Sequence, residues 1–464
     1  MRSIILPASH FFLSLPTPNY QLTLAGIYIH IPFCKSKCGY CGFYSLPSLK
    51  LKERFLEALK REIVERKDYL ASEGMSYRPQ QPIDTLALKA RYDMGCKGSV
   101  SMPSKAPTIQ TLYFGGGTPS LLSIDEIGDI LHLIKDTYAV AENAEITLEA
   151  NPDTLSPEYL EGLRRHGVNR LSIGIQSFFD DDLKYLGRRH DAHHARQCLD
   201  WAKQAGFSNI SIDLIYGLPT SDAEQWNKNL DIFFDYGLPH LSAYALTLEP
   251  NSILTKQIEL GKAMPISDDD ALRDYEILCK RAKENGFLHY EISNFCRRGM
   301  HSKHNASYWF GTPYIGFGPS AHSYDGTSRQ LNASSMEMYS DCLSAASRHC
   351  EERSNPDNTL SSLDCFVVPP RNDAMRVQGP VSEIEQLTPE QRYDEYVMLR
   401  LRTHWGIDLK WLKREMGERF STYCEQHAQP LIAQGRLSQT REFLYLTDEQ
   451  MLFADGVAEE LFWE

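Results

Sequence analysis

The chain has 464 residues, of which 42% are hydrophobic and 23% are charged, a globular composition that excludes a disordered or fibrous protein. Its 48 Lys and Arg residues against 61 Asp and Glu residues give a formal net charge of −13, which argues against a protein that coats nucleic acid. No apolar run is long enough to span a bilayer, and 11 cysteines are too few for a disulfide scaffold in a chain of this length.

Residues 1–25 are expected to form an N-terminal extension without the apolar stretch and cleavage site of a signal peptide, so we expect a cytoplasmic protein. From residue 27 to residue 246, short apolar runs alternate with helical patterns, which predicts a parallel sheet, either open or closed into a barrel. Ser123 with Glu126 forms a capping-box pattern, and Ser156 followed by Pro157 starts another helix. The expected strands are Ile27–Ile31, Leu112–Phe114, Ile146–Glu149, Leu171–Ile175, Ile210–Ile215 and Leu241–Ala245, and the expected helices are Leu51–Leu70, Ser123–Tyr138, Ser156–His166, His193–Ala205 and Ala223–Tyr236.

The later part of the chain no longer shows the alternation of strands and helices. Two irregular stretches, 72–108 and 349–377, are expected to be surface insertions. From residue 387 onward, helices at Pro389–Thr403, Leu409–Met416 and Ser421–Gln434 precede a short hairpin, which is typical of a winged-helix-like module. We therefore expect a core at 26–330 with an insertion at about 72–108, a linker at 331–380 with the second insertion, and a mostly helical C-terminal domain at 381–464.

Three cysteines carry the main chemical signal. Cys34, Cys38 and Cys41 form a C-x3-C-x2-C loop directly after the first strand. Three thiolates on one loop can bind three irons of a [4Fe–4S] cluster and leave the fourth iron open to another ligand. The alternative is a structural zinc site with His30 as the fourth ligand, but the spacing favours iron and sulfur.

The sequence from Tyr28 to Cys34 and the cysteine loop resemble the radical S-adenosylmethionine (SAM) superfamily, in the branch that holds oxygen-independent coproporphyrinogen III oxidases and heme chaperones. The resemblance extends from Gly26 to the C-terminus, apart from the two irregular stretches. It implies an α/β fold with a partial (β/α)6 TIM-like barrel. It also implies a [4Fe–4S] cluster whose open iron binds the amino and carboxylate groups of SAM.

Polar residues recur where successive strands end, which is where barrel proteins build their sites. Taken singly, each of these residues also fits an ordinary structural role: Glu149 and Asp213 could be helix caps or ion-pair partners, and Arg188 could be a solvated charge. The glycine run after the second strand would let the backbone approach a ligand closely. The resemblance implies SAM contacts at Tyr28, Tyr40, Gly116, Gly117, Thr118, Glu149, Gln176, Arg188 and Asp213.

Two features resemble the chaperones more than the oxidases. An aromatic residue, Phe43, stands where the oxidases carry a further cysteine, although Gly42 is shared with the oxidases. The run His304-Asn-Ala-Ser-Tyr-Trp309 matches the chaperone pattern H-N-x-x-Y-W. His304 would offer an imidazole to heme iron, with His322 as a second candidate. Without the resemblance, His304 would be taken as an ordinary loop histidine.

The resemblance implies a protein that binds heme, a [4Fe–4S] cluster and SAM and delivers heme to an acceptor protein, with no catalytic residue assigned. Its partners would be that acceptor, in the cytoplasm or at a membrane, and a protein that donates electrons to the cluster. No nucleic-acid partner is expected. The alternative is an enzyme, oxygen-independent coproporphyrinogen III oxidase. A zinc protein on an inactive barrel is a third class.

Overall fold

The computed structural model describes residues 24–42, 44–71, 107–250, 252–343 and 380–464. Most of the N-terminal extension, Phe43 and nearly all of both irregular stretches lie outside the described residues. Within the described part of the chain, no helix is both long and apolar enough to cross a membrane.

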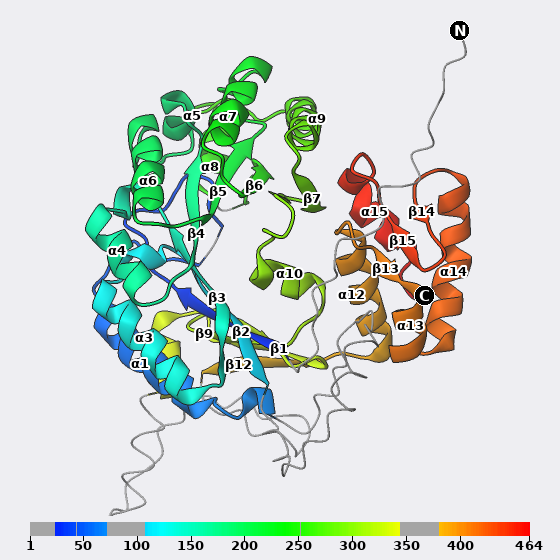
Figure 1. Ribbon diagram of the computed structural model, residues 1–464, viewed down its shortest axis with the longest axis horizontal. Coiled ribbons are helices and arrows are strands. Elements are labelled where there is room, and N and C mark those ends of the chain that lie inside the picture. The colour runs from blue at the N-terminus through cyan, green and yellow to red at the C-terminus, as the bar shows by residue number, and fades with distance from the viewer. Residues whose placement is uncertain (1–23, 43, 72–106, 251, 344–379) are drawn as a thin grey trace, which may run out of the picture.

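A large, mainly parallel sheet forms the framework (Figure 1). Within the described ranges its 12 strands run in the order β12-β11-β10-β9-β1-β2-β3-β4-β5-β6-β8-β7. The predicted strands are its parallel centre, and they confirm the expected α/β fold: β1 (Leu24–Ile31), β2 (Thr108–Gly116), β3 (Val140–Ala150), β4 (Arg170–Gln176), β5 (Asn209–Tyr216) and β6 (His240–Ala245).

The sheet extends beyond these strands at both edges. A further parallel strand, β9 (Tyr314–Phe317), pairs with the outer side of β1. The remaining strands are antiparallel and, apart from β12, only three to five residues long, too short to show a period in the sequence. They are β7 (Leu288–Glu291), β8 (Asn294–Cys296), β10 (His322–Tyr324), β11 (Ser328–Asn332) and β12 (Val381–Gln386).

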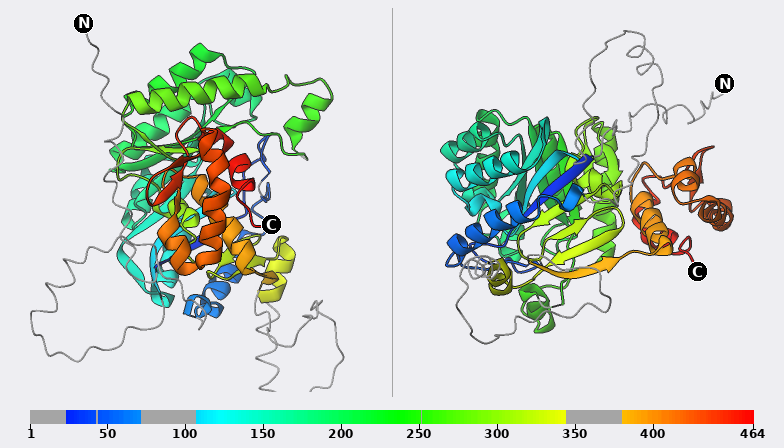
Figure 2. Two further views of the ribbon diagram at one scale, coloured as in Figure 1. Left: turned by 90° about the vertical axis from the view of Figure 1, so that its right-hand side faces the viewer. Right: turned by 90° about the horizontal axis from the view of Figure 1, so that it is seen from below.

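Helices cover the outer face of the curved sheet, whereas the helix at Lys303–Trp309 lies on its inner side (Figures 1 and 2). The predicted capping box is present, because the Ser123 side chain accepts from Glu126 N and the Glu126 carboxylate accepts from Ser123 N. The helices of this part are α1 (Lys52–Glu65), α3 (Ile124–Thr137), α4 (Pro157–Arg165), α5 (Asp180–Tyr185), α6 (Ala192–Gln204), α7 (Ala223–Asp235), α8 (Ile253–Glu259), α9 (Asp268–Glu284) and α10 (Lys303–Trp309), with short 3-10 turns η1 (Tyr69–Ala71), η2 (Pro119–Leu121) and η3 (Pro152–Thr154).

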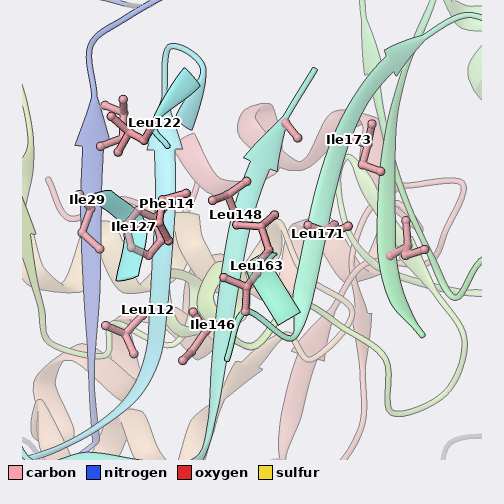
Figure 3. Close-up of a cluster of buried hydrophobic side chains, with 14 of the residues drawn as sticks. Ile29, Leu112, Phe114, Leu122, Ile127, Ile146, Leu148, Leu163, Leu171 and Ile173 are labelled. Carbon is pink, nitrogen blue, oxygen red and sulfur yellow. The ribbon is translucent and has the colours of Figure 1, made fainter. Parts of the chain in front are cut away.

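Apolar and polar side chains alternate along the strands, so the apolar core lies on one face of the sheet and the barrel interior on the other. Figure 3 shows buried side chains such as Phe114, Leu148 and Leu171 packed against Ile127 of α3 and Leu163 of α4. Because successive side chains of a strand point to opposite faces, the residues between these apolar positions face the inside of the barrel. The strands therefore present a polar inner face to the space around which they curve.

The C-terminal module follows the sheet and has its own buried apolar cluster. Its elements are α12 (Pro389–Leu401), β13 (Ile407–Asp408), α13 (Leu409–Glu415), α14 (Glu418–Ala433), β14 (Ser438–Gln439), β15 (Phe443–Tyr445), η4 (Met451–Phe453) and α15 (Ala454–Glu459). The small sheet has the order β13-β15-β14. The predicted hairpin is β14 and β15, and β13 is a third strand that sequence patterns did not reveal. This order of helices and strands is that of a winged helix. The module packs beside the barrel, where Ile292 N donates to Arg402 O.

Candidate functional site

The cysteine loop follows β1 and is held by backbone hydrogen bonds to the segment that follows it and to two distant segments. Cys34 N donates to Leu46 O (3.0 Å), Gly39 N donates to Leu186 O at the end of α5 (3.2 Å), and Leu254 N of α8 donates to Gly39 O (2.8 Å). These contacts turn all three cysteines toward one cavity of about 500 Å³. A cavity of this size accommodates a small-molecule cofactor.

The cavity brings the predicted cluster and SAM residues together, with one exception, and the heme candidate His304 does not line it. Its wall is built from the carboxyl ends of β2 to β6, as parallel-strand architecture requires. Tyr28 is the exception, because it does not line the cavity and instead stacks on Tyr113 inside the barrel, with ring centroids 6.1 Å apart. The predicted residues that line the cavity are Cys34, Cys38, Tyr40, Cys41, Gly116, Gly117, Thr118, Glu149, Gln176, Arg188 and Asp213.

The glycines at the end of β2 let that strand lie directly against the segment that leads into the cysteine loop. A Cβ on Gly117 would stand 2.5 Å from Phe33 O, and one on Gly116 would stand 2.9 Å from the His30 ring. Gly116 also has a φ of 107°, which side chains with a Cβ rarely adopt. The glycine run is therefore required by chain packing beside the loop.

Arg188 connects the cysteine loop to the strand ends. Its guanidinium donates to Asn151 Oδ1 (2.6 Å), to Gly174 O (2.8 Å) and to Cys38 Sγ (3.4 Å). Thr118 donates its hydroxyl to Cys34 Sγ (3.6 Å) and accepts from Asn151 Nδ2 (3.0 Å). Two of the three sulfurs thus face donors that stabilise a thiolate, which suits the thiolate ligands of an iron–sulfur cluster.

Two partly buried carboxyl groups also line the cavity. Glu149 accepts a hydrogen bond from the Tyr113 hydroxyl (2.8 Å), and Ser172 donates to Asp213 (3.4 Å). Burial raises the pKa of Glu149 to about 7, and the charge of Asp213 adds to the shift. Burial likewise raises the pKa of Asp213 to about 6, while Arg170 and Arg188 oppose the rise. Both groups can therefore change charge near neutral pH.

His30 is poorly placed for the zinc alternative. Its Nδ1 lies 3.2 Å from the Tyr28 hydroxyl and its Nε2 lies 3.2 Å from Tyr44 O, so both ring nitrogens are engaged. In the part of the chain that the structure describes, no group of three or more His, Cys, Asp or Glu side chains is arranged to hold one metal ion. A cluster differs from a zinc site in spreading its cysteine ligands over separate irons.

The two histidines proposed for heme have opposite surroundings. His304, on α10, is 1% exposed, and its ring nitrogens lie 2.8 Å from the Thr111 hydroxyl and 2.9 Å from the Tyr308 hydroxyl. Burial lowers the pKa of His304 to about 3, so the ring is neutral. His322, on β10, is exposed. In this conformation only His322 of the two presents its imidazole to a ligand from outside.

Sequence reasoning missed several residues of the cavity wall. Asn151 lies two positions after Glu149, and Ser172 lies two positions before Gly174 on the inner face of β4. Tyr244 lines the cavity from β6 and is 42% exposed, which is unusual for an aromatic residue on a central strand. Applying the two-residue period of strands outward from Glu149 and Gln176 would have found the first two.

Comparisons with known proteins agree with this architecture. A model of the radical SAM superfamily matches residues 104–232, and a model of the HemN C-terminal domain matches residues 387–453. The solved structure of coproporphyrinogen III oxidase (HemN) from Escherichia coli is similar with a TM-score of 0.70 at 20% identity, covering 95% of this chain and 90% of that one. The barrel, the cysteine loop and these matches define the class: the chain belongs to the radical SAM superfamily and carries a HemN C-terminal domain.

Among its relatives are proteins described as heme chaperone HemW. The protein of that name from Mycobacterium tuberculosis is 31% identical over 440 residues, which cover 94% of each chain. The one from Bacillus subtilis is 28% identical over 433 residues, which cover 93% of this chain and 97% of the other. Membership of the radical SAM superfamily implies a [4Fe–4S] cluster and SAM, and the donor set of the cysteine loop fits such a cluster.

Proposed function

We propose that this protein is a heme chaperone, which binds heme, a [4Fe–4S] cluster and exchangeable SAM and passes heme to an acceptor protein. The observation that carries the proposal is the near full-length match to relatives described as heme chaperones, at 31% identity over 94% of both chains. The H-N-x-x-Y-W run from His304 to Trp309 supports the same branch. Phe43, the other discriminating residue, lies outside the described residues.

In this proposal Cys34, Cys38 and Cys41 hold the cluster. When bound, the cluster would supply an open iron for the amino and carboxylate groups of SAM and an electron from a donor protein. The protein's own contribution is the cavity wall: Arg188 is available to pair with the SAM carboxylate, and Glu149 to accept a hydrogen bond from the SAM amino group. Tyr40, Gly116, Gly117, Thr118, Gln176 and Asp213 line the remaining wall. In this proposal the glycines would contact the methionine part of SAM, and Gln176 and Asp213 its ribose.

The pH dependence of SAM binding tests the role of Glu149. A raised pKa means that the carboxylate form, which accepts hydrogen bonds from the SAM amino group, becomes more populated as pH rises through about 7. SAM affinity is therefore expected to rise up to about ten-fold between pH 6 and pH 8, the range over which such a group ionises. Calorimetric or filtration measurements of SAM binding across this range provide the check. Glu149→Gln should bind weakly with a flattened profile, and an unchanged profile in that variant would remove Glu149 from the site.

Within this proposal His322 is the heme ligand, because its imidazole is exposed. Replacing this residue by alanine removes an imidazole ligand from the iron. We expect heme affinity to fall at least about ten-fold, because even the loss of a residue that only supports a metal ligand has an effect of that size. The Soret band of the loaded protein should also shift. A control is His132→Ala on α3, whose imidazole is exposed and faces Asp136 at 3.3 Å. Equal heme affinity and spectra in the two variants would exclude His322 as the ligand.

The second candidate function is oxygen-independent coproporphyrinogen III oxidase, because the oxidase structure from Escherichia coli shares the fold over nearly the whole chain. An anaerobic assay with coproporphyrinogen III, SAM and a reductant separates the two. We expect no sustained protoporphyrinogen formation by the cluster-loaded protein. Steady turnover would contradict the chaperone proposal and identify a biosynthetic enzyme.

A further inference from the structure

The H-N-x-x-Y-W helix contacts the inner face of β2 and β3 next to the cavity, and this contact suggests a different role for His304. The helix α10 is fastened to β3 because the buried Glu145 carboxylate accepts from Lys303 N (3.2 Å) and from His304 N (3.1 Å). Glu145 and Glu149 lie on the same strand, four residues apart. The start of the helix is thus tied to the strand that supplies a carboxylate to the cavity.

The His304 ring belongs to an aromatic stack inside the barrel. It lies on the Tyr113 ring with centroids 5.0 Å apart and an interplanar angle of 23°, and Tyr28 stacks on both rings. Thr111 and Tyr308 fix the orientation of the imidazole from either side. Tyr113, held in this stack, donates its hydroxyl to Glu149 Oε1 (2.8 Å).

Two glycines keep the space around the stack closed. A Cβ on Gly26 would stand 2.9 Å from the Thr111 hydroxyl and 3.3 Å from the His304 ring. A Cβ on Gly115 would stand 2.9 Å from the Tyr28 ring and 3.0 Å from the Tyr113 ring. The imidazole is therefore enclosed by fixed neighbours, and it has no open side for the iron of a porphyrin.

We propose that His304 is a positioning residue of the SAM cavity, which holds the Tyr113 phenol in the place from which it fixes Glu149. This inference rests on the proposed function, in which Glu149 binds the amino group of SAM. It assigns the histidine of the H-N-x-x-Y-W run to SAM binding, whereas heme binding depends on other residues. Because a hydrogen bond to a carboxylate is stronger than one between neutral groups, losing the phenol should be measurable in SAM affinity.

The test is a double-mutant cycle on the cluster-loaded protein, with SAM and heme affinities measured separately. Tyr113→Phe is expected to weaken SAM binding about ten-fold, and His304→Leu about five-fold, because each disturbs the same hydrogen bond. The double variant should lose no more than Tyr113→Phe alone, and heme affinity should stay unchanged in all three. His304→Asn, which keeps a polar contact to Thr111 but loses the ring, should behave like His304→Leu and serves if the latter fails to fold.

A matched control exists in the C-terminal module, where His427 stacks on Tyr423 with centroids 3.8 Å apart, away from the cavity. His427→Leu should leave SAM affinity at the wild-type value. Unchanged SAM affinity in His304→Leu, or losses that simply multiply in the double variant, would overturn the positioning role. Lost heme binding with intact SAM binding would overturn it in favour of heme ligation by His304. A wild-type protein that binds no SAM would instead contradict the proposed function itself.

Discussion

The Cys38→Ser variant, reconstituted with iron and sulfide under anaerobic conditions, is expected to lack the brown chromophore of a [4Fe–4S] cluster and to bind SAM at least about 100-fold more weakly than the wild type. A hydroxyl is a harder and less acidic ligand than a thiol, so it does not replace a thiolate on iron. Cys38 also accepts a hydrogen bond from Arg188, and its loss therefore disturbs the polar network that joins the loop to the strand ends. Iron analysis and visible absorbance provide the readout.

The matched control for this variant is Cys342→Ser. Cys342 is exposed and does not line the cavity. The control should retain wild-type iron content, colour and SAM affinity. A cluster that forms equally in both variants would mean that the C-x3-C-x2-C loop is not the cluster site. Zinc bound to the wild type in place of iron would favour the structural zinc protein.

The Arg188→Met variant is expected to lose about 100-fold in SAM affinity, which corresponds to about 3 kcal/mol for hydrogen bonds to a charged group. Methionine keeps much of the side-chain length but removes the guanidinium. Asn151 Oδ1 and Gly174 O then lose their donor, and the expected pairing with the SAM carboxylate disappears. The cluster itself should still assemble, because all three cysteines remain. Equilibrium binding of SAM to the cluster-loaded variant measures the effect.

The neighbouring Arg189 provides a control within the same segment. Its side chain is 55% exposed and lies 3.5 Å from Asp153, so removing it should change SAM affinity by less than about three-fold, as is usual for a surface ion pair. If Arg189→Met weakened SAM binding as much as Arg188→Met, the effect would come from local charge and not from the contacts of Arg188 in the cavity.

The parallel centre of the fold could be predicted because its signals are local. Phe114, Leu148 and Leu171 stand in apolar runs whose period and length identify buried strands, and the hydrogen bonds between Ser123 and Glu126 involve residues three positions apart. The edge strands β7, β8 and β10 could not be predicted in this way. They are three or four residues long, and they are strands only because a neighbouring strand supplies their hydrogen bonds.

The site shows the same contrast. Glu149, Gln176 and Asp213 could be predicted to share one cavity, because they stand toward the carboxyl ends of parallel strands, which meet at one edge of the sheet. The surroundings of His304 depend on Thr111, almost 200 residues away in the chain, and on the closeness of Gly26 to the ring. No spacing within the H-N-x-x-Y-W run encodes these contacts, so the motif indicated an important histidine without revealing that its ring is enclosed.

The measurement that tests the proposed function most directly is an anaerobic titration of the cluster-loaded protein with heme, followed by mixing with a heme-free acceptor protein. The account predicts a saturable change in the Soret band at near-stoichiometric heme, and transfer of that heme to the acceptor at a rate faster than its spontaneous release. A linear, non-saturating change like that of heme in buffer, or bound heme that never leaves, would contradict a chaperone.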